Sequence, residues 1–316
     1  MNPNNDRRKA VISWSGGKDS AIALHKVLTG GEIEVKYLLT TVNEHFNRIS
    51  MHGVRVELLD AQAERIGIPL VKVLLPEMAD METYERTMAH TLGGLKNKGI
   101  TSLIFGDIFL EDLRKYREMQ LGKVKFGAIF PLWNMPTKKL IRDFIDLGFK
   151  AIIVCVDERF LDKSFAGRNI DEAFINDLPP GVDPCGENGE FHSFVYDGPI
   201  FRRPISLTKG EIVYRRYERP REQKQTYDDR QRTPDPYSTG FWYCDLMKND
   251  VADHDTFNKD KKCPSCGEIF LCGPSAPGGK CWCSELPNVM TIENEMGCLC
   301  PACLKKAIDK IIKNKL

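Results

Sequence analysis

Two glycines, two hydroxyls, a lysine and a carboxylate stand together in the segment SGGKDS at residues 15–20. Residues 9–14 before it have the composition of a short buried strand, and residues 20–28 after it carry apolar side chains at helical spacing. Glycines at a strand-to-helix turn let backbone N–H groups approach an anion, and the first turn of a helix adds unpaired donors and a partial positive charge. The segment therefore predicts a phosphate-binding loop in which Lys18 supplies a full positive charge.

The spacing of this loop differs from that of a Walker-type loop, which needs four residues between its glycines before Gly-Lys-Ser/Thr. It resembles instead the pyrophosphate loop (PP-loop) of N-type ATP pyrophosphatases, which cleave ATP between the α and β phosphates. The resemblance implies that the loop grips the departing pyrophosphate and that Asp19 helps to hold Mg²⁺. The alternative is a tight glycine turn with a solvated Lys18 and Asp19. The implied ATP ligands in the loop are Ser15, Gly16, Gly17, Lys18, Asp19 and Ser20.

Composition and charge exclude several classes of protein. At 316 residues the chain is long enough for two domains and a small additional module, and its net charge of +1 gives no overall attraction to nucleic acid or an anionic membrane. No apolar run approaches the length that spans a bilayer, and the N-terminal residues lack the apolar core of a signal peptide. We therefore expect a soluble cytoplasmic protein without membrane contact, and its oligomeric state stays open, a homo-oligomer included.

Strands and helices alternate after the loop. Strand-like runs at residues 33–42, 70–75 and 101–105 are separated by stretches of helical spacing near residues 53–66 and 81–98. Such alternation predicts an α/β fold with a parallel sheet and helices on both of its faces, joined by right-handed crossovers. The expected architecture is Rossmann-like, of the HUP type, followed by a second α/β domain that binds the substrate and a small C-terminal zinc module.

Ligands of such sheets bind beyond the carboxyl ends of the strands. Ser15, Thr41 and the pair Gly106-Asp107 are expected at that edge, where Asp107 would face the nucleotide or its metal ion rather than only cap a helix. Polar residues after the second and fourth strands are candidates for binding ATP or an acidic substrate, although a histidine such as His52 is, taken alone, more often an ordinary surface residue. These candidates are His52, Arg55 and Arg114.

A second dense motif lies in the string GENGEFHS at residues 186–193, with YDGPIF after it and GDIFLEDLR before it. The three ordered motifs resemble the diphthine–ammonia ligase family of N-type ATP pyrophosphatases, and the likeness covers about residues 9–206. The resemblance implies that a carboxylate is activated as an acyl-adenylate and then attacked by ammonia to give an amide. It also implies that pyrophosphate release pulls the first step forward, while Mg²⁺ and Lys18 offset the charge that develops as the bond between the α and β phosphates breaks.

Residues of GENGEFHS would position ammonium, accept its proton or hold the substrate, without an individual assignment. The alternative is structural, with Glu187 and Glu190 capping a hairpin and His192 packed beneath it. The predicted catalytic residues are Lys18, Asp19, Asp107, Glu187, Glu190 and His192. The predicted substrate-binding residues of this motif are Glu187, Asn188, Gly189 and Glu190.

Eight of the eleven cysteines lie between residues 263 and 303, which in a reducing compartment indicates metal. Two CPxC turns favour tetrahedral zinc, with Cys263, Cys266, Cys300 and Cys303 around one ion. Disulfides or an iron–sulfur cluster are the alternatives. The segment resembles the cysteine-rich CWC domain, and closed all-cysteine sites indicate a structural role. The four remaining cysteines, expected around a second zinc, are Cys272, Cys281, Cys283 and Cys298.

The predicted domains are a PP-loop ATP pyrophosphatase domain at residues 1–126, a substrate-binding domain at 127–213, a linker at 214–260, and a zinc module with a closing helix at 261–316. The linker mixes arginines with tyrosines, which is also typical of RNA-binding segments, but its neighbouring acids favour a solvated connector over nucleic-acid binding.

We expect an ATP-dependent carbon–nitrogen ligase that uses ATP, Mg²⁺, ammonia and a carboxylate the sequence does not identify, one carried on a protein included. One alternative is a tRNA-modifying ATP pyrophosphatase. It would need a reactive cysteine pair near the nucleotide, where the chain offers only Cys155 and Cys185. Another alternative is a non-catalytic nucleotide-binding protein whose zinc module recruits a partner.

Overall fold

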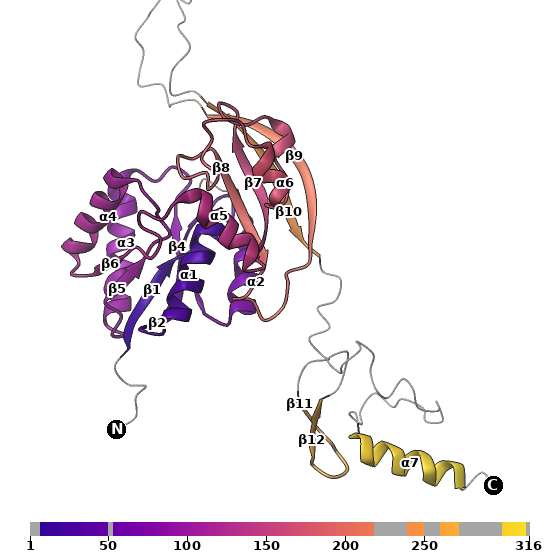
Figure 1. Ribbon diagram of the computed structural model, residues 1–316. Coiled ribbons are helices and arrows are strands. Elements are labelled where there is room, and N and C mark those ends of the chain that lie inside the picture. Colours follow the sequence, from indigo (N-terminus) through magenta and orange to yellow (C-terminus); the bar gives the residue numbers. More distant parts are fainter. Residues whose placement is uncertain (1–6, 50–52, 218–238, 250–259, 272–298, 314–316) are drawn as a thin grey trace, which may run out of the picture. The chain divides into compact units, whose positions relative to one another are not determined.

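The computed structural model describes residues 7–49, 53–217, 239–249, 260–271 and 299–313 (Figure 1). The chain forms two compact units, residues 1–248 and 249–316, and each is described by itself. Among the described residues, no helix combines the length and the apolar character needed to cross a membrane.

The first unit is built on a six-stranded sheet in the order β3-β2-β1-β5-β6, with β4 also paired to β2. All pairings are parallel except that of the short β3 with β2. The α/β class with a parallel sheet predicted above is thereby confirmed. The strands are β1 (Arg8–Ser13), β2 (Ile33–Asn43), β3 (Arg48–Ile49), β4 (Leu70–Leu75), β5 (Ser102–Ile104) and β6 (Gly127–Ile129).

Helices cover both faces of this sheet. Along β1 the side chains alternate, because Ala10 and Ile12 belong to the core shared with α1 and α2, whereas Val11 belongs to the core shared with α3 and α4. A strand buried on both faces is the expected consequence of parallel pairing with helical crossovers. The four helices are α1 (Lys18–Gly30), α2 (Val56–Ile66), α3 (Met81–Lys96) and α4 (Glu111–Lys123).

A second sheet of four antiparallel strands follows, in the order β8-β7-β10-β9. It shares one continuous core with the α1 and α2 face of the first sheet, which includes Phe144, Phe174 and Phe194. The strands are β7 (Lys150–Asp157), β8 (Phe191–Asp197), β9 (Leu207–Tyr217) and β10 (Thr239–Lys248), and the helical segments are α5 (Thr137–Asp146), η1 (Lys163–Phe165) and α6 (Glu172–Asp177).

Two segments differ from their predicted place. Strand β10 lies inside the span 214–260 that was expected as a linker. It belongs to the second sheet instead, because it pairs with both β7 and β9 and buries Cys244 and Leu246. Strand β6 begins one residue past the predicted boundary at 126 and pairs with β5 in the first sheet. Residues 218–238 of the predicted linker lie outside the described residues.

The second unit contains a two-stranded antiparallel ribbon and a helix. The ribbon brings the first CPxC turn between its two strands, and the second CPxC turn opens the helix. The elements are β11 (Asp260–Lys262), β12 (Ile269–Leu271) and α7 (Pro301–Lys313). The closing helix predicted for this module thus begins at Pro301.

An ion-pair cluster links β10 to β3 and to the residue that precedes α2. The Asp245 carboxylate accepts hydrogen bonds from Arg55 Nη2 at 2.7 Å and from Arg48 Nη1 at 2.9 Å. Burial by itself would raise the pKa of Asp245, but the two guanidinium groups outweigh it and lower the pKa to about 2. The pair therefore stabilises the folded state at pH values above the ordinary pKa of an aspartate, near 3.9.

We expect Asp245→Asn to lower the free energy of unfolding at pH 7 by about 1 to 2 kcal/mol, because the charge pairing is lost in a half-buried setting. Urea unfolding at several pH values measures this. The folded pKa lies below the unfolded one, so the contribution is complete above the unfolded value and should fall by about half at pH 3. Asp60→Asn, at the exposed pair with Lys72, is the control and should cost about 0.5 kcal/mol or less. A pH-independent Asp245→Asn effect would contradict the pairing.

Candidate functional site

A cavity of about 250 Å³ opens at the carboxyl edge of the first sheet, where the loop after β1, the residues after β5 and the loop before β8 meet. These three segments are far apart in the sequence and hold the motifs SGGKDS, GDIFLEDLR and GENGEFHS. Ten of the predicted residues line the cavity, and they are Ser15, Gly17, Lys18, Asp19, Ser20, Gly106, Asp107, Glu187, Gly189 and His192.

Close backbone approach at Gly106 brings two of these segments together. A Cβ on this residue would lie 2.8 Å from the carbonyl carbon of Asp19, at the start of α1. A distance below 3.0 Å is not tolerated against backbone, so only glycine lets the end of β5 approach the SGGKDS loop this closely.

The conformation of the loop is fixed by Gln62 on α2, whose side chain is 0% exposed. Its Nε2 donates to the carbonyl oxygens of Gly16 at 2.9 Å and Val195 at 2.6 Å, and its Oε1 accepts from Trp14 Nε1 at 2.8 Å. Gly16 adopts a positive φ of 75°, and a Cβ there would lie 2.7 Å from Gln62 Oε1. The positive φ and the close contact with Gln62 both require glycine at position 16.

Lys18 is only 5% exposed, so it is not the solvated lysine of the alternative glycine turn. Its Nζ lies 2.8 Å from Asp19 Oδ2 and 5.3 Å from the centre of the Phe191 ring. Burial would lower the pKa of Lys18, but the charges of Asp19 and Glu187 raise it above its ordinary value. The ammonium group therefore stays protonated in the cavity at neutral pH.

Glu187 joins the GENGEFHS loop to the end of β5, because its Oε1 accepts from the backbone N–H of Ile108 at 2.7 Å. Burial raises the pKa of Glu187 to about 7, and the nearby charge of Asp19 adds to the rise. The same burial, together with the charge of Lys18, lowers the pKa of His192 to about 4. At neutral pH the cavity therefore holds a neutral imidazole and a carboxyl group poised to gain or lose a proton.

Glu190 and Asn188 do not line the cavity. The carboxylate of Glu190, which is 1% exposed, accepts from Asn188 N at 2.9 Å, Asn188 Nδ2 at 2.9 Å and Asp183 N at 3.0 Å. A buried carboxylate with three donors organises the loop from within. In this structure Glu190 therefore shapes the GENGEFHS loop, while Glu187 reaches into the cavity.

Three further predicted ligands lie elsewhere. Thr41 is paired with Val73 inside the sheet, and Arg55 is held by Asp245. Arg114 stacks its guanidinium 4.6 Å from the ring centre of Trp133 and pairs with Glu118. His52 lies outside the described residues.

Arg117, not singled out from the sequence, is the second cation of the cavity. Its Nη2 lies 3.1 Å from Asp107 Oδ1 and its Nε lies 2.7 Å from Asp107 Oδ2, and its guanidinium stacks 4.2 Å from the ring centre of Phe105. Burial raises the pKa of Asp107, and Arg117 beside it opposes the rise. Ser193 was not singled out from the sequence either, and its hydroxyl accepts a hydrogen bond from the backbone N–H of Lys18 at 3.1 Å.

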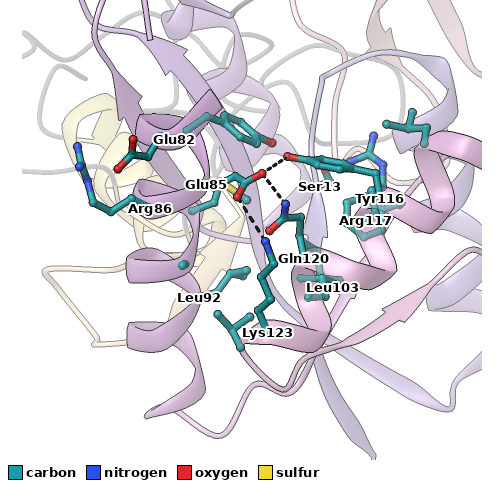
Figure 2. A pocket seen from close by; sticks show the side chains of 17 residues that line it. Ser13, Glu82, Glu85, Arg86, Leu92, Leu103, Tyr116, Arg117, Gln120 and Lys123 are labelled. Atoms are coloured by element: carbon teal, nitrogen blue, oxygen red, sulfur yellow. Dashed lines mark hydrogen bonds and ion pairs between the residues drawn. The ribbon is translucent and has the colours of Figure 1, made fainter. Parts of the chain in front are cut away.

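A second cavity of about 440 Å³ shares a wall with the first, formed by Ser13, Phe105, Leu113 and Arg117. Figure 2 shows that α3 and α4 face each other across it, with Glu85 bonded to Tyr116, Gln120 and Lys123. Most of the other lining side chains are apolar or aromatic. Such a cavity suits a flat, largely apolar group that continues from a ligand in the first cavity.

Cys155 and Cys185 are both buried, and burial raises the pKa of each thiol well above its ordinary range. Thiols of this kind are poor nucleophiles at neutral pH. The reactive cysteine pair that a sulfur-transferring enzyme would need is therefore absent from this part of the described structure.

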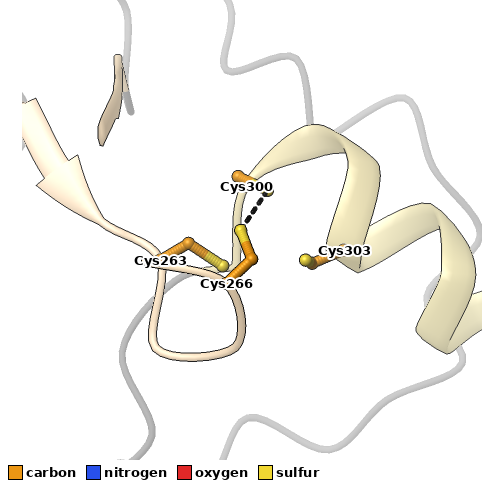
Figure 3. A group of neighbouring side chains, drawn as sticks. All are labelled: Cys263, Cys266, Cys300 and Cys303. Carbon is orange, nitrogen blue, oxygen red and sulfur yellow. Dashed lines mark hydrogen bonds between the residues drawn. The ribbon is translucent and has the colours of Figure 1, made fainter. Parts of the chain in front are cut away.

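The second unit holds a cluster of four cysteines, Cys263, Cys266, Cys300 and Cys303, whose sulfur atoms lie within 4.8 Å of one another. Figure 3 shows these side chains converging from the CPxC loop and from the start of α7. Four sulfurs at this separation, from two CPxC turns, match a tetrahedral zinc site. The other four cysteines, predicted around a second zinc, lie outside the described residues.

Models of known protein families match three parts of the chain. The N-terminal domain of diphthamide synthase matches residues 8–123 and its C-terminal domain matches residues 136–223, so that together they cover more than half of the chain. The chain belongs to the diphthamide synthase family. The cysteine-rich CWC domain matches residues 263–305.

Curated relatives of this diphthamide synthase family member are diphthine–ammonia ligases. The chain is 24% identical to that of Schizosaccharomyces pombe over 63% of its own length and 36% of the relative. It is 24% identical to that of Homo sapiens and 23% identical to that of Danio rerio, over 82% and 86% of those relatives. The chain thus spans about a third of the first relative and most of the other two.

The cavity lies where the two matched diphthamide synthase domains meet. The N-terminal match supplies the SGGKDS loop and Asp107, whereas the C-terminal match supplies Glu187 and His192. The family relationship supports a ligase of the ATP pyrophosphatase type.

The cysteine cluster predicts bound zinc that depends on each of its thiolates. We expect Cys300→Ser to lose one zinc equivalent per chain relative to the unaltered protein, because a closed site needs all four ligands. Elemental analysis of the purified full chain measures this difference whatever the total zinc content. Cys244→Ser, which removes a buried thiol of the first unit, is the matched control and should keep its zinc. Equal zinc in Cys300→Ser and the unaltered protein would rule out this metal centre.

Proposed function

We propose that this protein is an ATP-dependent ligase that adenylates a carboxylate, releases pyrophosphate and transfers ammonia to form an amide and AMP. The observation that carries the proposal is the single cavity in which the phosphate loop, Asp107 and the cavity-facing residues of GENGEFHS meet. The relatives act on diphthine by name, so diphthine is the first carboxylate to test. The cytoplasm is the proposed compartment.

The β and γ phosphates of ATP are proposed to lie on the loop. The backbone N–H groups of Gly17 and Lys18 bond to the hydroxyls of Ser15 and Ser193, at 3.2 Å and 3.1 Å. Phosphate oxygens are stronger acceptors than these hydroxyls and would replace them. Lys18, charged and almost fully buried, would then offset the charge of the departing pyrophosphate in a medium of low dielectric constant.

The nucleoside of ATP is proposed to occupy the second cavity. Ser13 and Phe105 belong to both cavities, so a nucleotide with its phosphates on the loop can cross this shared wall at the ends of β1 and β5. The chain reverses its direction of winding between these two adjacent strands, which is where ligands bind in open α/β sheets. Apolar side chains of α3 and α4 would then pack against the base.

The reaction has two proposed steps. An oxygen of the substrate carboxylate forms a bond to the α-phosphorus, while the bond from that phosphorus to the bridging oxygen breaks and its electron pair leaves with pyrophosphate. The nitrogen of ammonia then bonds to the acyl carbon, the carbon–oxygen bond to AMP breaks, and a proton of the nitrogen passes to a base. Glu187 is proposed as this base, because its pKa of about 7 allows it to accept and release a proton at neutral pH.

Mg²⁺ fits the carboxylates of the cavity. Asp19 and Asp107 both line it, and the buried Asp107 Oδ2, which pairs with Arg117 Nε at 2.7 Å, makes no well-aligned hydrogen bond within the described structure. Carboxylate oxygens of this kind are the ligands that a hard cation prefers. Bound there, Mg²⁺ would neutralise part of the phosphate charge. The zinc of the cysteine cluster is proposed to be structural, since four thiolates leave no open coordination position.

Incubation with labelled ATP, ammonium and diphthine or another candidate carboxylate tests the proposal. We expect AMP and pyrophosphate as products, and Lys18→Gln to lower their formation at least about 100-fold because the buried charge that stabilises the leaving group is lost. Lys26→Gln, an exposed lysine of the same helix, is the control. ADP as the product would overturn the proposal, and nucleotide binding without turnover on any candidate would favour a nucleotide sensor.

Glu187→Gln separates the two steps. Glutamine keeps an oxygen that can accept from Ile108 N but cannot take up a proton, so we expect amide formation to fall about 100-fold or more while pyrophosphate release persists. At a fixed concentration of free ammonia, the unaltered enzyme should gain activity as the pH rises through about 7, where Glu187 becomes ionised, and the variant should lack this rise. An unchanged pH profile in the variant would remove Glu187 from the role of base.

A further inference from the structure

The geometry points to Arg117 as the residue that binds the α-phosphate, the phosphoryl group attacked in the reaction. This inference rests on the proposed ATP site and adds a catalytic cation to it. Arg117 lies on the wall that the two cavities share, between the phosphate loop and the space assigned to the nucleoside. In a nucleotide that spans both spaces, the α-phosphate is the group at that junction.

Helical spacing aims Arg117 at this place. Leu110, Leu113 and Arg117 recur at intervals of three and four residues, and all three line the phosphate cavity. Figure 2 shows Arg117 approaching the second cavity from α4 beside Tyr116. The neighbouring basic residues of the helix, Arg114 and Lys115, pair with Glu118 and Glu111 and do not line either cavity.

Charge in the phosphate cavity is unbalanced without a second cation. Asp19, Asp107 and Glu187 bring carboxyl groups, and ATP adds about four negative charges at neutral pH. Among the described lining residues the permanent cations are Lys18 and Arg117, because burial keeps His192 neutral. Lys18 sits on the phosphate loop with Asp19, so Arg117 is the cation left for the phosphate next to the nucleoside.

The guanidinium is held in place and still has donors to offer. Stacking on Phe105 and contact with Asp107 fix its plane before any ligand arrives. Asp107 engages Nε and Nη2, which leaves the Nη1 donors of the fork for a phosphate oxygen. Nε and Asp107 Oδ2 form an ion pair at 2.7 Å but are not aligned for a hydrogen bond, so both are buried without one.

As the carboxylate oxygen bonds to the α-phosphorus and the bond to the bridging oxygen breaks, negative charge is spread over the non-bridging oxygens of that phosphorus. A preorganised guanidinium beside them stabilises this charge. Arg117 would thus act on the group that reacts, and Lys18 on the group that leaves.

Direct titration with fragments of ATP tests the assignment without relying on turnover. AMP contains the α-phosphate, adenosine lacks it, and inorganic pyrophosphate probes the loop alone. We expect Arg117→Gln to weaken AMP about 10- to 100-fold while adenosine and pyrophosphate stay within about 3-fold, because one charge-assisted contact is lost. Arg117→Lys should fall between. Lys115→Gln, an exposed cation of the same helix, should leave all three affinities unchanged.

The double variant Asp107→Asn/Arg117→Gln separates this role from a purely structural one. It removes the buried carboxylate that Arg117→Gln leaves without its cation, so a selective loss of AMP binding in both variants supports the direct contact. Equal AMP affinity in Arg117→Gln and the unaltered protein, or an equal loss for AMP, adenosine and pyrophosphate that the double variant restores, would overturn it. If the unaltered protein binds neither AMP nor adenosine, the proposed nucleotide site itself fails.

Discussion

The carbonyl oxygen of Gly16 accepts hydrogen bonds from Gln62 Nε2 and from the backbone N–H of Val195, each at 2.9 Å. These two donors come from α2 and from β8, so one atom of the SGGKDS loop joins the two sheets of the first unit. Satisfying buried polar groups is compulsory in a protein core, and each of these groups has its partner only when both sheets are in place. The SGGKDS loop therefore reaches its shape together with β8, which begins within the GENGEFHS motif, and the cavity between them depends on these two hydrogen bonds.

Burial of the groups where the two sheets meet also sets the pKa values of the side chains in the cavity. Removal of water raises the pKa of Glu187 and lowers that of His192, whereas Lys18 keeps its proton because carboxylates surround it. A solvated loop with the same residues would hold an ionised glutamate. The cavity beside the SGGKDS loop thus holds a glutamate, Glu187, whose pKa suits proton transfer at neutral pH only because the loop packs against the second sheet. The residues of the loop do not by themselves determine this packing.

Local patterns in the sequence predicted the parallel sheet and the grouping of Cys263 with Cys300, because each depends on residues close together in the chain or on a fixed ligand spacing. Partners from distant segments escaped this reasoning. Arg55 was expected to meet a substrate but pairs with Asp245, and nothing in the local sequence marks a residue 190 positions away as its partner. Within GENGEFHS, Glu190 and Glu187 have the same side-chain chemistry, and only the fold of the loop decides which one reaches into the cavity.

The choice between Arg114 and Arg117 shows where a finer reading of the sequence succeeds. Three residues advance a helix by about 300°, so the two arginines lie about 60° apart, and the apolar positions decide which one faces the site. Leu110 and Leu113 put Arg117 on the inner face, and Arg114 turns toward Trp133 and solvent. A cation that continues an apolar stripe at the end of a sheet is therefore a better candidate for a phosphate ligand than one that merely lies close to a motif. The same constraint explains how α4 serves both cavities, because one helical face runs along their shared wall.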